Sequence, residues 1–254
     1  MIFMSELTGL YALWYREFKV FTREKSRIIS SLVQPLLWLV IFGTGLGSSI
    51  EGISGTSYTS FIYPGILAMT VLFGSLFFGL YIIFDRRVDF LKEVLVAPLS
   101  RTTIFFGKVL GGATDGIIEI AMLMILGYLF FNINFTLISA LETILIILLL
   151  MISILSVGLI IGSMMTSPEG FGLISSFVIF PLFFLSGALF PVKNLPSWLY
   201  AFVVINPVSY AVDALRTVIL GVGNFGLGLD MLVLIAFAVA MVLIGTEAFR
   251  RMKV

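Results

Sequence analysis

Six long apolar stretches constrain the fold of this chain more than any other feature of its sequence. A helix needs about 20 mostly apolar residues to cross the hydrocarbon core of a bilayer, and each stretch reaches that length. We therefore predict an all-α integral membrane protein with six transmembrane helices, forming a single transmembrane domain over residues 1–254. The predicted spans cover residues 28–47, 61–84, 104–131, 138–165, 171–191 and 229–249.

The composition supports membrane insertion and excludes several other classes of protein. Hydrophobic residues make up 60% of the chain and charged residues 11%, against about 45–50% and about 25% in soluble domains. The formal net charge is +1, which provides no basic surface for nucleic acid. The sequence contains no cysteine and no histidine, which excludes disulfides and zinc sites. We accordingly expect no nucleic-acid partner and no metal or cofactor in this chain.

The basic residues are distributed unequally between the two sides of the membrane. Of the 15 Lys and Arg residues, 12 fall in the stretches before the first span, between the second and third, and after the sixth; Lys108 lies just inside the third span, and only Lys193 and Arg216 fall on the other side. Cytoplasmic loops carry an excess of Lys and Arg, so these stretches, and both termini with them, are predicted to be cytoplasmic. The N-terminal stretch does not resemble a cleavable signal peptide. We therefore expect a multi-pass protein of the cell membrane.

Two further segments are apolar but do not fit a simple span. Residues 6–27 carry an apolar stripe at helical spacing, with Glu17 expected to face away from it. They are predicted to form an interfacial helix on the cytoplasmic leaflet; a helix packed on a soluble partner is the alternative. Residues 192–228 are interrupted by Pro196, Asn206–Pro207 and several glycines. They are predicted to form short re-entrant helices between the fifth and sixth spans, rather than an ordinary apolar loop.

Residues 85–101, between the second and third spans, mix charges of both signs with apolar side chains. Phe90 and Leu91 begin an apolar set at helical spacing, Pro98 ends the helix, and Ser100 can cap the next one. A loop that only reversed the chain would be shorter and plainer. A short amphipathic helix here would give a partner protein a surface to bind; a solvated connector is the alternative on the residues alone.

Two sequence motifs indicate a family. The first is FLKEVLVAPLSR at residues 90–101, and the second is FLSGALFPV at residues 184–192, followed by LPSWL at 195–199 and by Asn206–Pro207. Together they resemble the type-2 ABC exporter permeases, especially the daunorubicin-resistance and nodulation-factor export branch. The six spans, the cytoplasmic termini and the interfacial helix agree with that family. The resemblance therefore covers essentially the whole chain.

The resemblance implies the permease part of an ATP-driven exporter, which pairs with a second permease copy and with two separate ATP-binding subunits. The chain supports this separation because Gly107–Lys108, its only Gly-Lys pair, is followed by Val109 and lacks the phosphate-binding loop. ATP and magnesium would be held by the partner subunits. The resemblance also implies that residues 85–95 form a coupling helix that seats in a groove of the ATP-binding subunit. The positions carried over from the family are Arg86, Arg87, Asp89, Phe90, Leu91, Lys92 and Glu93.

Two carboxylates stand four residues apart within the predicted third span. Asp115 and Glu119 share one helix face, and carboxylates inside a membrane usually face a partner or a wet cavity. We predict that they line a translocation path, with Lys108 helping to neutralise their face. The alternatives are a structural pair bonded to another span and a pair reached by cytoplasmic water.

Small residues recur in the third and fourth predicted spans. Gly107, Gly111 and Gly112 lie in the third, whereas Gly158 and Gly162 form a small-xxx-small pair in the fourth. Such residues let two helix backbones approach closely. We predict tight helix packing at both places.

Three functions remain open on the sequence alone. The predicted function is ATP-driven export of an amphipathic substrate, such as a drug, a lipid or a lipid-linked saccharide. The first alternative is an ion-coupled secondary carrier that uses Asp115 and Glu119, although the halves show none of the self-similarity common in carriers. The second is a membrane scaffold that anchors a soluble enzyme through residues 85–101.

Overall fold

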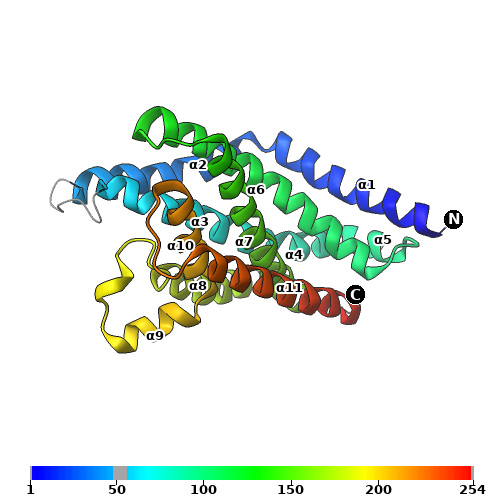
Figure 1. Ribbon diagram of the computed structural model, residues 1–254. Helices are drawn as coiled ribbons and strands as arrows, with labels where there is room; N and C mark the ends of the chain where they lie inside the picture. Colours follow the sequence, from blue (N-terminus) through cyan, green and yellow to red (C-terminus); the bar gives the residue numbers. More distant parts are fainter. Residues whose placement is uncertain (1, 48–55, 253–254) are drawn as a thin grey trace.

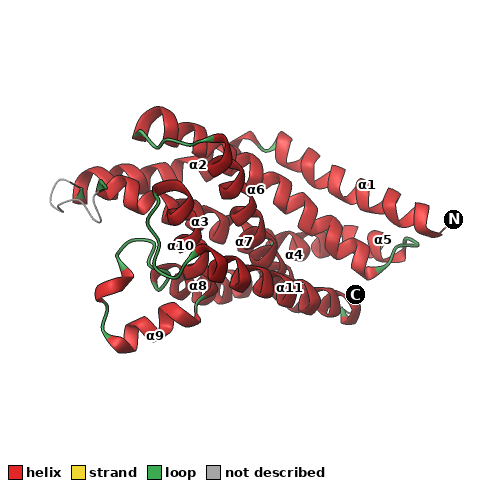
Figure 2. Ribbon diagram, viewed as in Figure 1, coloured by secondary structure: helices red, strands yellow, loops and turns green. Residues whose placement is uncertain are grey.

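A computed structural model describes residues 2–47 and 56–252, and in these ranges the chain is helical without a β-strand (Figures 1 and 2). The N- and C-termini lie at the same end of the molecule (Figure 1). This is the arrangement expected for an even number of spans. The helices are α1 (Ile2–Arg23), α2 (Lys25–Val40, continued by a π-helical turn, Ile41–Leu46), α3 (Tyr58–Phe78), α4 (Leu80–Arg87), α5 (Phe90–Val96), α6 (Arg101–Phe131), α7 (Leu137–Met164), α8 (Pro168–Phe184), α9 (Ser197–Ile205), α10 (Pro207–Leu220) and α11 (Leu227–Arg251), with a 3₁₀ turn at Val192–Asn194.

Five helical segments of the described chain are long and apolar enough to cross a membrane, which confirms an all-α integral membrane protein. They correspond to the predicted spans one to four and six. The predicted fifth span is represented by α8, whose 17 residues are at the short end of the length that a bilayer requires. α8 ends before the predicted boundary because the chain turns at Gly187, whose φ of +72° favours glycine. The five long segments are Lys25–Gly45, Tyr58–Arg87, Arg101–Phe131, Leu137–Met164 and Leu227–Arg251.

Side-chain caps set where several of these helices begin. The hydroxyl of Ser100 accepts the backbone N–H of Thr103 at 3.1 Å, as predicted for the start of α6. Ser57 caps α3 through the N–H of Ser60 in the same way. Ser167 caps α8 and is followed by a proline in the first turn, where a missing N–H does no harm.

The two short helices between α8 and α11 meet at an angle of 86°, which confirms the predicted break at Asn206–Pro207. The side chain of Asn206 accepts the N–H of Val208 at 3.0 Å and donates to the carbonyl of Leu182 at 2.7 Å. These bonds satisfy backbone groups that a bend at membrane depth would otherwise expose. α9 is largely exposed, whereas α10 packs between α3, α7 and α11. Both lie away from the two termini (Figure 1).

α1 runs beside the first half of α6 in the same direction (Figure 1). Leu13 packs on Gly107, and the indole N–H of Trp14 donates to Thr114 at 2.9 Å. At the start of both helices, Glu6 accepts hydrogen bonds from Thr103 and Ser100, which hold the pKa of Glu6 below its usual range. The predicted N-terminal helix therefore exists and packs on its own chain. Its place on the cytoplasmic leaflet stays a prediction.

Glycines mark the closest approach of two helices, as predicted. A Cβ added to Gly158 of α7 would overlap the carbonyl oxygen of Leu76 in α3, and one added to Gly162 would overlap the carbonyl of Gly79. Gly79 is the residue between α3 and α4. In α6, a Cβ on Gly111 would come within 2.5 Å of the Glu17 side chain. Close backbone packing of this kind is a major source of helix association in membranes.

Gly158→Ala should therefore destabilise the protein, because the new methyl group meets backbone that cannot rotate away. Overpacking of this kind typically costs about 1–3 kcal/mol, which should appear as a lower melting temperature of the detergent-solubilised chain. Gly172→Ala in α8 is the matched control, since a Cβ there meets no atom within 4 Å. Equal melting temperatures for the two variants would contradict the packing described here.

Candidate coupling surface and membrane cavity

α4 and α5 form a sharp elbow at the end of the molecule where the termini lie (Figure 1). The turn occurs at Asp89, which has a left-handed φ of 58°; aspartate tolerates that conformation better than most residues do. The predicted short amphipathic helix is therefore present as α5. We call Arg87, Asp89, Lys92 and Glu93, whose side chains are exposed here, the elbow surface.

The elbow surface is polar and accessible. Lys92 and Asp89 form an ion pair of 2.7 Å, and their side chains are 57% and 69% exposed. An exposed pair of this kind contributes little to stability, so both groups are free to exchange partners. Val88 and Val96 add exposed apolar side chains on either side. These residues can contact a partner without disturbing the fold, and their role in coupling stays a prediction.

Three of the residues predicted to contact a partner are instead engaged within this chain. Leu91 is 2% exposed and belongs to the hydrophobic core, so its assignment to a partner's groove is wrong. Arg86 donates to the carbonyls of Met165 at 2.9 Å and Ser163 at 3.1 Å, fastening α4 to the end of α7. Phe90 is half-buried, with the guanidinium of Arg16 3.9 Å from its ring centre. An amphipathic pattern alone could not show that the apolar face of α5 packs inward.

Next to α5, through the contact of Arg16 with Phe90, lies a cluster of four charged side chains, three of them buried, which we call the charge cluster. Lys108 of α6 donates to Glu17 of α1 at 2.6 Å and also to Asp85 of α4. Arg16 of α1 bonds to the same two carboxylates, at 2.7 Å to Glu17 and 2.6 Å to Asp85. Glu17, Asp85 and Lys108 are each at most 4% exposed. The two buried anions are paired with buried Lys108 and with partly exposed Arg16, so that neither carboxylate is left without a cation.

The charge cluster corrects two predictions. Glu17 does not face away from the apolar side of its helix but lies between α1, α4 and α6. Lys108 does not neutralise Asp115 and Glu119, because both of its ion pairs are made with the cluster. The cluster joins Phe90, through Arg16, to the helix that carries Asp115. It therefore connects the elbow with the interior of the membrane domain.

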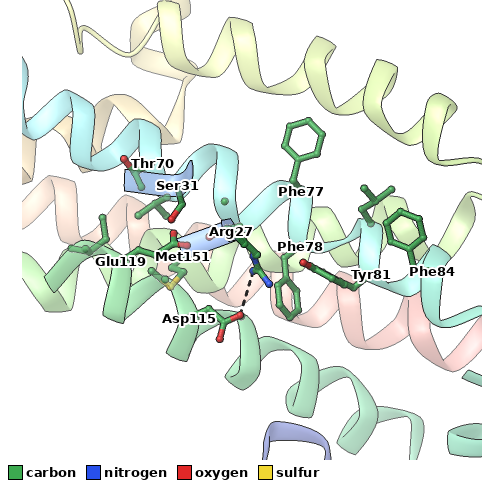
Figure 3. A pocket seen from close by; sticks show the side chains of 17 residues that line it. Arg27, Ser31, Thr70, Phe77, Phe78, Tyr81, Phe84, Asp115, Glu119 and Met151 are labelled. Atoms are coloured by element: carbon green, nitrogen blue, oxygen red, sulfur yellow. Dashed lines mark hydrogen bonds and ion pairs between the residues drawn. The ribbon is translucent and has the colours of Figure 1, made fainter. Parts of the chain in front are cut away.

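Asp115 and Glu119 line a cavity of about 260 Å³ bounded mainly by α2, α3, α4 and α6 (Figure 3). The guanidinium of Arg27 donates to Asp115 at 3.3 Å, shown as the dashed line in Figure 3. Arg27 thus takes the role that the sequence had suggested for Lys108. Ser31, one turn further along α2, lines the same cavity, and its hydroxyl donates to the carbonyl of Ile28 at 3.0 Å. The structure confirms that the two carboxylates share one face and places a cavity before them.

A second cavity, of about 250 Å³, adjoins the first. Glu119, Ser31, Thr70, Gly74 and Phe77 line both, so Glu119 stands at their boundary. Neither cavity is lined by a residue of the charge cluster. Within the described residues no group of three or more His, Asp or Glu side chains is arranged to hold a metal ion.

Comparison with known proteins identifies the family. The sequence pattern of the ABC-2 type transporter family matches residues 8–220, which is most of the chain. The chain belongs to the ABC-2 type transporter family. The resemblance carried by the two motifs is thereby confirmed, and the chain is a transport permease subunit of an ABC transporter.

Curated relatives agree with this membership of the ABC-2 family. The chain is 34% identical over 213 residues to the putative transport permease ycf38 of Cyanophora paradoxa, covering 82% of this chain and 72% of the relative. It is 30% identical over 252 residues to the inner membrane transport permease YadH of Escherichia coli K12, covering 96% and 95%. It is 29% identical over 249 residues to nodulation protein J of Rhizobium meliloti, covering 94% and 92%.

Proposed function

We propose that this ABC-2 permease subunit dimerises and works with separate ABC ATP-binding subunits to export an amphipathic substrate from the cytoplasm. ATP and magnesium would bind to those subunits. The observation that carries the proposal is that one helix, α6, holds Lys108 of the charge cluster and, two turns further on, Asp115 of the cavity wall. A movement imposed on the elbow surface would therefore reach the cavity through a single rigid element.

The contacts along this route are specific. Phe90 of α5 lies under Arg16, Arg16 bonds to Asp85, and Asp85 bonds to Lys108. Buried ion pairs hold a defined geometry because an unpaired partner would be strongly disfavoured. A push on α5 would thus shift α1, α4 and α6 together. The alternative of a solvated connector explains none of these contacts.

The cavity supplies a place for substrate on the proposed path. Asp115 and Glu119 lie on its wall beside aromatic side chains, among them Phe77, Tyr81 and Phe84 (Figure 3). A polar group and an apolar group of one molecule could be accommodated side by side, as an amphipathic substrate requires. This arrangement supports the prediction that the two carboxylates line the translocation path.

Measuring whether ATP or an ion gradient drives transport tests the proposal. The tagged permease, co-expressed with its ABC ATP-binding subunit, should co-purify with that subunit as a complex that hydrolyses ATP. In liposomes, transport by the complex should require ATP and should not follow an imposed proton gradient. Gradient-driven transport without the ATP-binding subunit would instead establish the ion-coupled carrier.

The proposed orientation in the cell membrane makes a separate prediction. Both termini and the elbow lie at one end of the molecule, whereas α9 lies away from it (Figure 1). In the sequence, Lys and Arg are concentrated around the elbow and in the stretches next to the termini. Ser197→Cys should react with an impermeant thiol reagent added outside intact cells, and Val96→Cys should not. The chain has no cysteine of its own, so the background is low. Labelling of Val96→Cys from outside would contradict cytoplasmic termini.

A further inference from the structure

We infer that the cavity beside Asp115 and Glu119 binds the protonated amine of an amphipathic cation. This inference rests on the proposed export function and narrows its substrate class. Asp115 and Glu119 are 3% and 7% exposed, and among the described residues that line the two cavities Arg27 is the one cation. The lining therefore has one carboxylate more than it has cations.

The hydrogen bonds of these carboxylates leave a vacant acceptor. Oδ2 of Asp115 accepts from Arg27, but Oδ1 is buried and has no partner in the part of the chain that the structure describes. Glu119 lines both cavities together with Ser31 and forms no ion pair with a described residue. A buried acceptor without a donor is costly. An ammonium group carries three N–H donors and a positive charge, and so supplies what both carboxylates lack.

The aromatic side chains that line the cavity favour an apolar ring or chain attached to the amine. Phe77, Phe78, Tyr81 and Phe84 line the cavity on the side of α3 and α4 (Figure 3), and the faces of such rings attract cations. Phe84 is 44% exposed, so the aromatic side reaches the surface of the molecule. Beyond Glu119 the second cavity is lined by Met69 and Phe73. An amine at Glu119 would therefore have apolar surface on both sides for a ring or chain.

Other classes of ligand fit less well. An anion would be repelled by the two carboxylates, and the single arginine of the lining, Arg27, is already paired with Asp115. A neutral hydrocarbon would bury the free oxygen of Asp115 without giving it a donor. The charge of the ligand, rather than its size, should therefore decide binding.

Three probes of nearly equal shape test this inference: 4-phenylbutylamine, which is cationic at pH 7, 4-phenylbutanol and 4-phenylbutyrate. Binding to the full-length chain in neutral detergent can be followed by saturation-transfer NMR and by the rise in melting temperature. The amine should bind at least about tenfold more tightly than the alcohol, which corresponds to about 1.4 kcal/mol, and the carboxylate should bind least. Equal binding of amine and alcohol, or preference for the carboxylate, would overturn the inference.

Variants locate the site. Glu119→Gln should weaken binding of 4-phenylbutylamine about tenfold, whereas Glu142→Gln, the same change on α7 outside both cavities, should leave it unchanged. Gly74→Ala keeps every charge and places a methyl group 3.7 Å from Oε2 of Glu119, without a clash that would prevent folding. It should weaken the amine several-fold, whereas Gly172→Ala should not. Unchanged binding in both Glu119→Gln and Gly74→Ala would place the amine elsewhere.

This test is independent of the export function. Binding is measured on the permease alone, without ATP, so a negative result would remove the substrate class and leave ATP-driven export standing. Conversely, if the permease bound the amine but formed no complex with an ATP-binding subunit, the amine site would stand and the proposed export function would be rejected.

Discussion

Lys108→Met is expected to destabilise the folded permease by about 3–5 kcal/mol, the range typical of removing one partner from a buried ion pair. Methionine keeps much of the volume of the lysine stem. It leaves Glu17 and Asp85, both nearly fully buried, with Arg16 as their remaining cation. Uncompensated negative charge would then lie between three helices. The measurement is the melting temperature of the detergent-solubilised chain, together with its yield.

Two further variants show whether a loss of stability in Lys108→Met comes from the charge cluster. Lys193→Met removes an exposed lysine and should leave the melting temperature almost unchanged. Lys108→Met combined with Glu17→Gln removes one charge of each sign and should recover part of the lost stability, because Arg16 still pairs with Asp85. If Lys108→Met were as stable as the unmodified chain, the charge cluster would not hold α1, α4 and α6 together.

Arg87→Glu combined with Lys92→Glu should weaken binding of the ATP-binding subunit at least about tenfold while the permease stays folded. Both residues are exposed in the elbow surface, and the pair of Lys92 with Asp89 is too exposed to stabilise the fold appreciably. If the elbow surface binds the ATP-binding subunit, reversing two of its charges places them opposite like charges of that subunit, which is strongly unfavourable. The affinity can be measured by titrating the purified ATP-binding subunit onto immobilised permease.

The matched control for this charge reversal is Arg250→Glu with Arg251→Glu. These arginines are also exposed and lie near the C-terminus, at the same end of the molecule (Figure 1). The control should keep most of the affinity. An equal loss in both double variants would indicate general electrostatic attraction, and no loss in either would exclude the elbow surface as a binding site. Leu91→Ala, by contrast, should lower stability, because it removes a core side chain.

The spans and their caps were predictable because they depend on local sequence. The length and hydropathy of the apolar stretches located all the long spans. Ser100 indicated the start of α6, because its hydroxyl caps the N–H of Thr103, only three residues further on. The break at Asn206–Pro207 follows from the geometry of proline. α8 ended early because of a turn at Gly187, which resembles other glycines in the sequence and gave no separate signal.

The candidate sites were predictable only in part, because their partners are distant in the sequence. Asp115 and Glu119 were recognised as sharing a face four residues apart, but Arg27, 88 residues from Asp115, was not identified as the partner. Lys108 and Glu17 are separated by 91 residues. The periodicity of α5 predicted its amphipathic character correctly. It could not distinguish a face that packs on the chain itself from one that binds a partner, and so Leu91 was misassigned.

The most direct test of the account is whether the elbow touches the ATP-binding subunit. Because the chain has no cysteine, Val96→Cys, at a site that is 87% exposed, can be labelled uniquely with a photoactivated benzophenone before the complex is assembled. The same label at Trp198→Cys, 66% exposed on α9, is the control from the other side of the molecule. We expect a crosslink to the ATP-binding subunit from Val96→Cys and none from Trp198→Cys. An assembled, ATP-hydrolysing complex that gives no crosslink from Val96→Cys would contradict it.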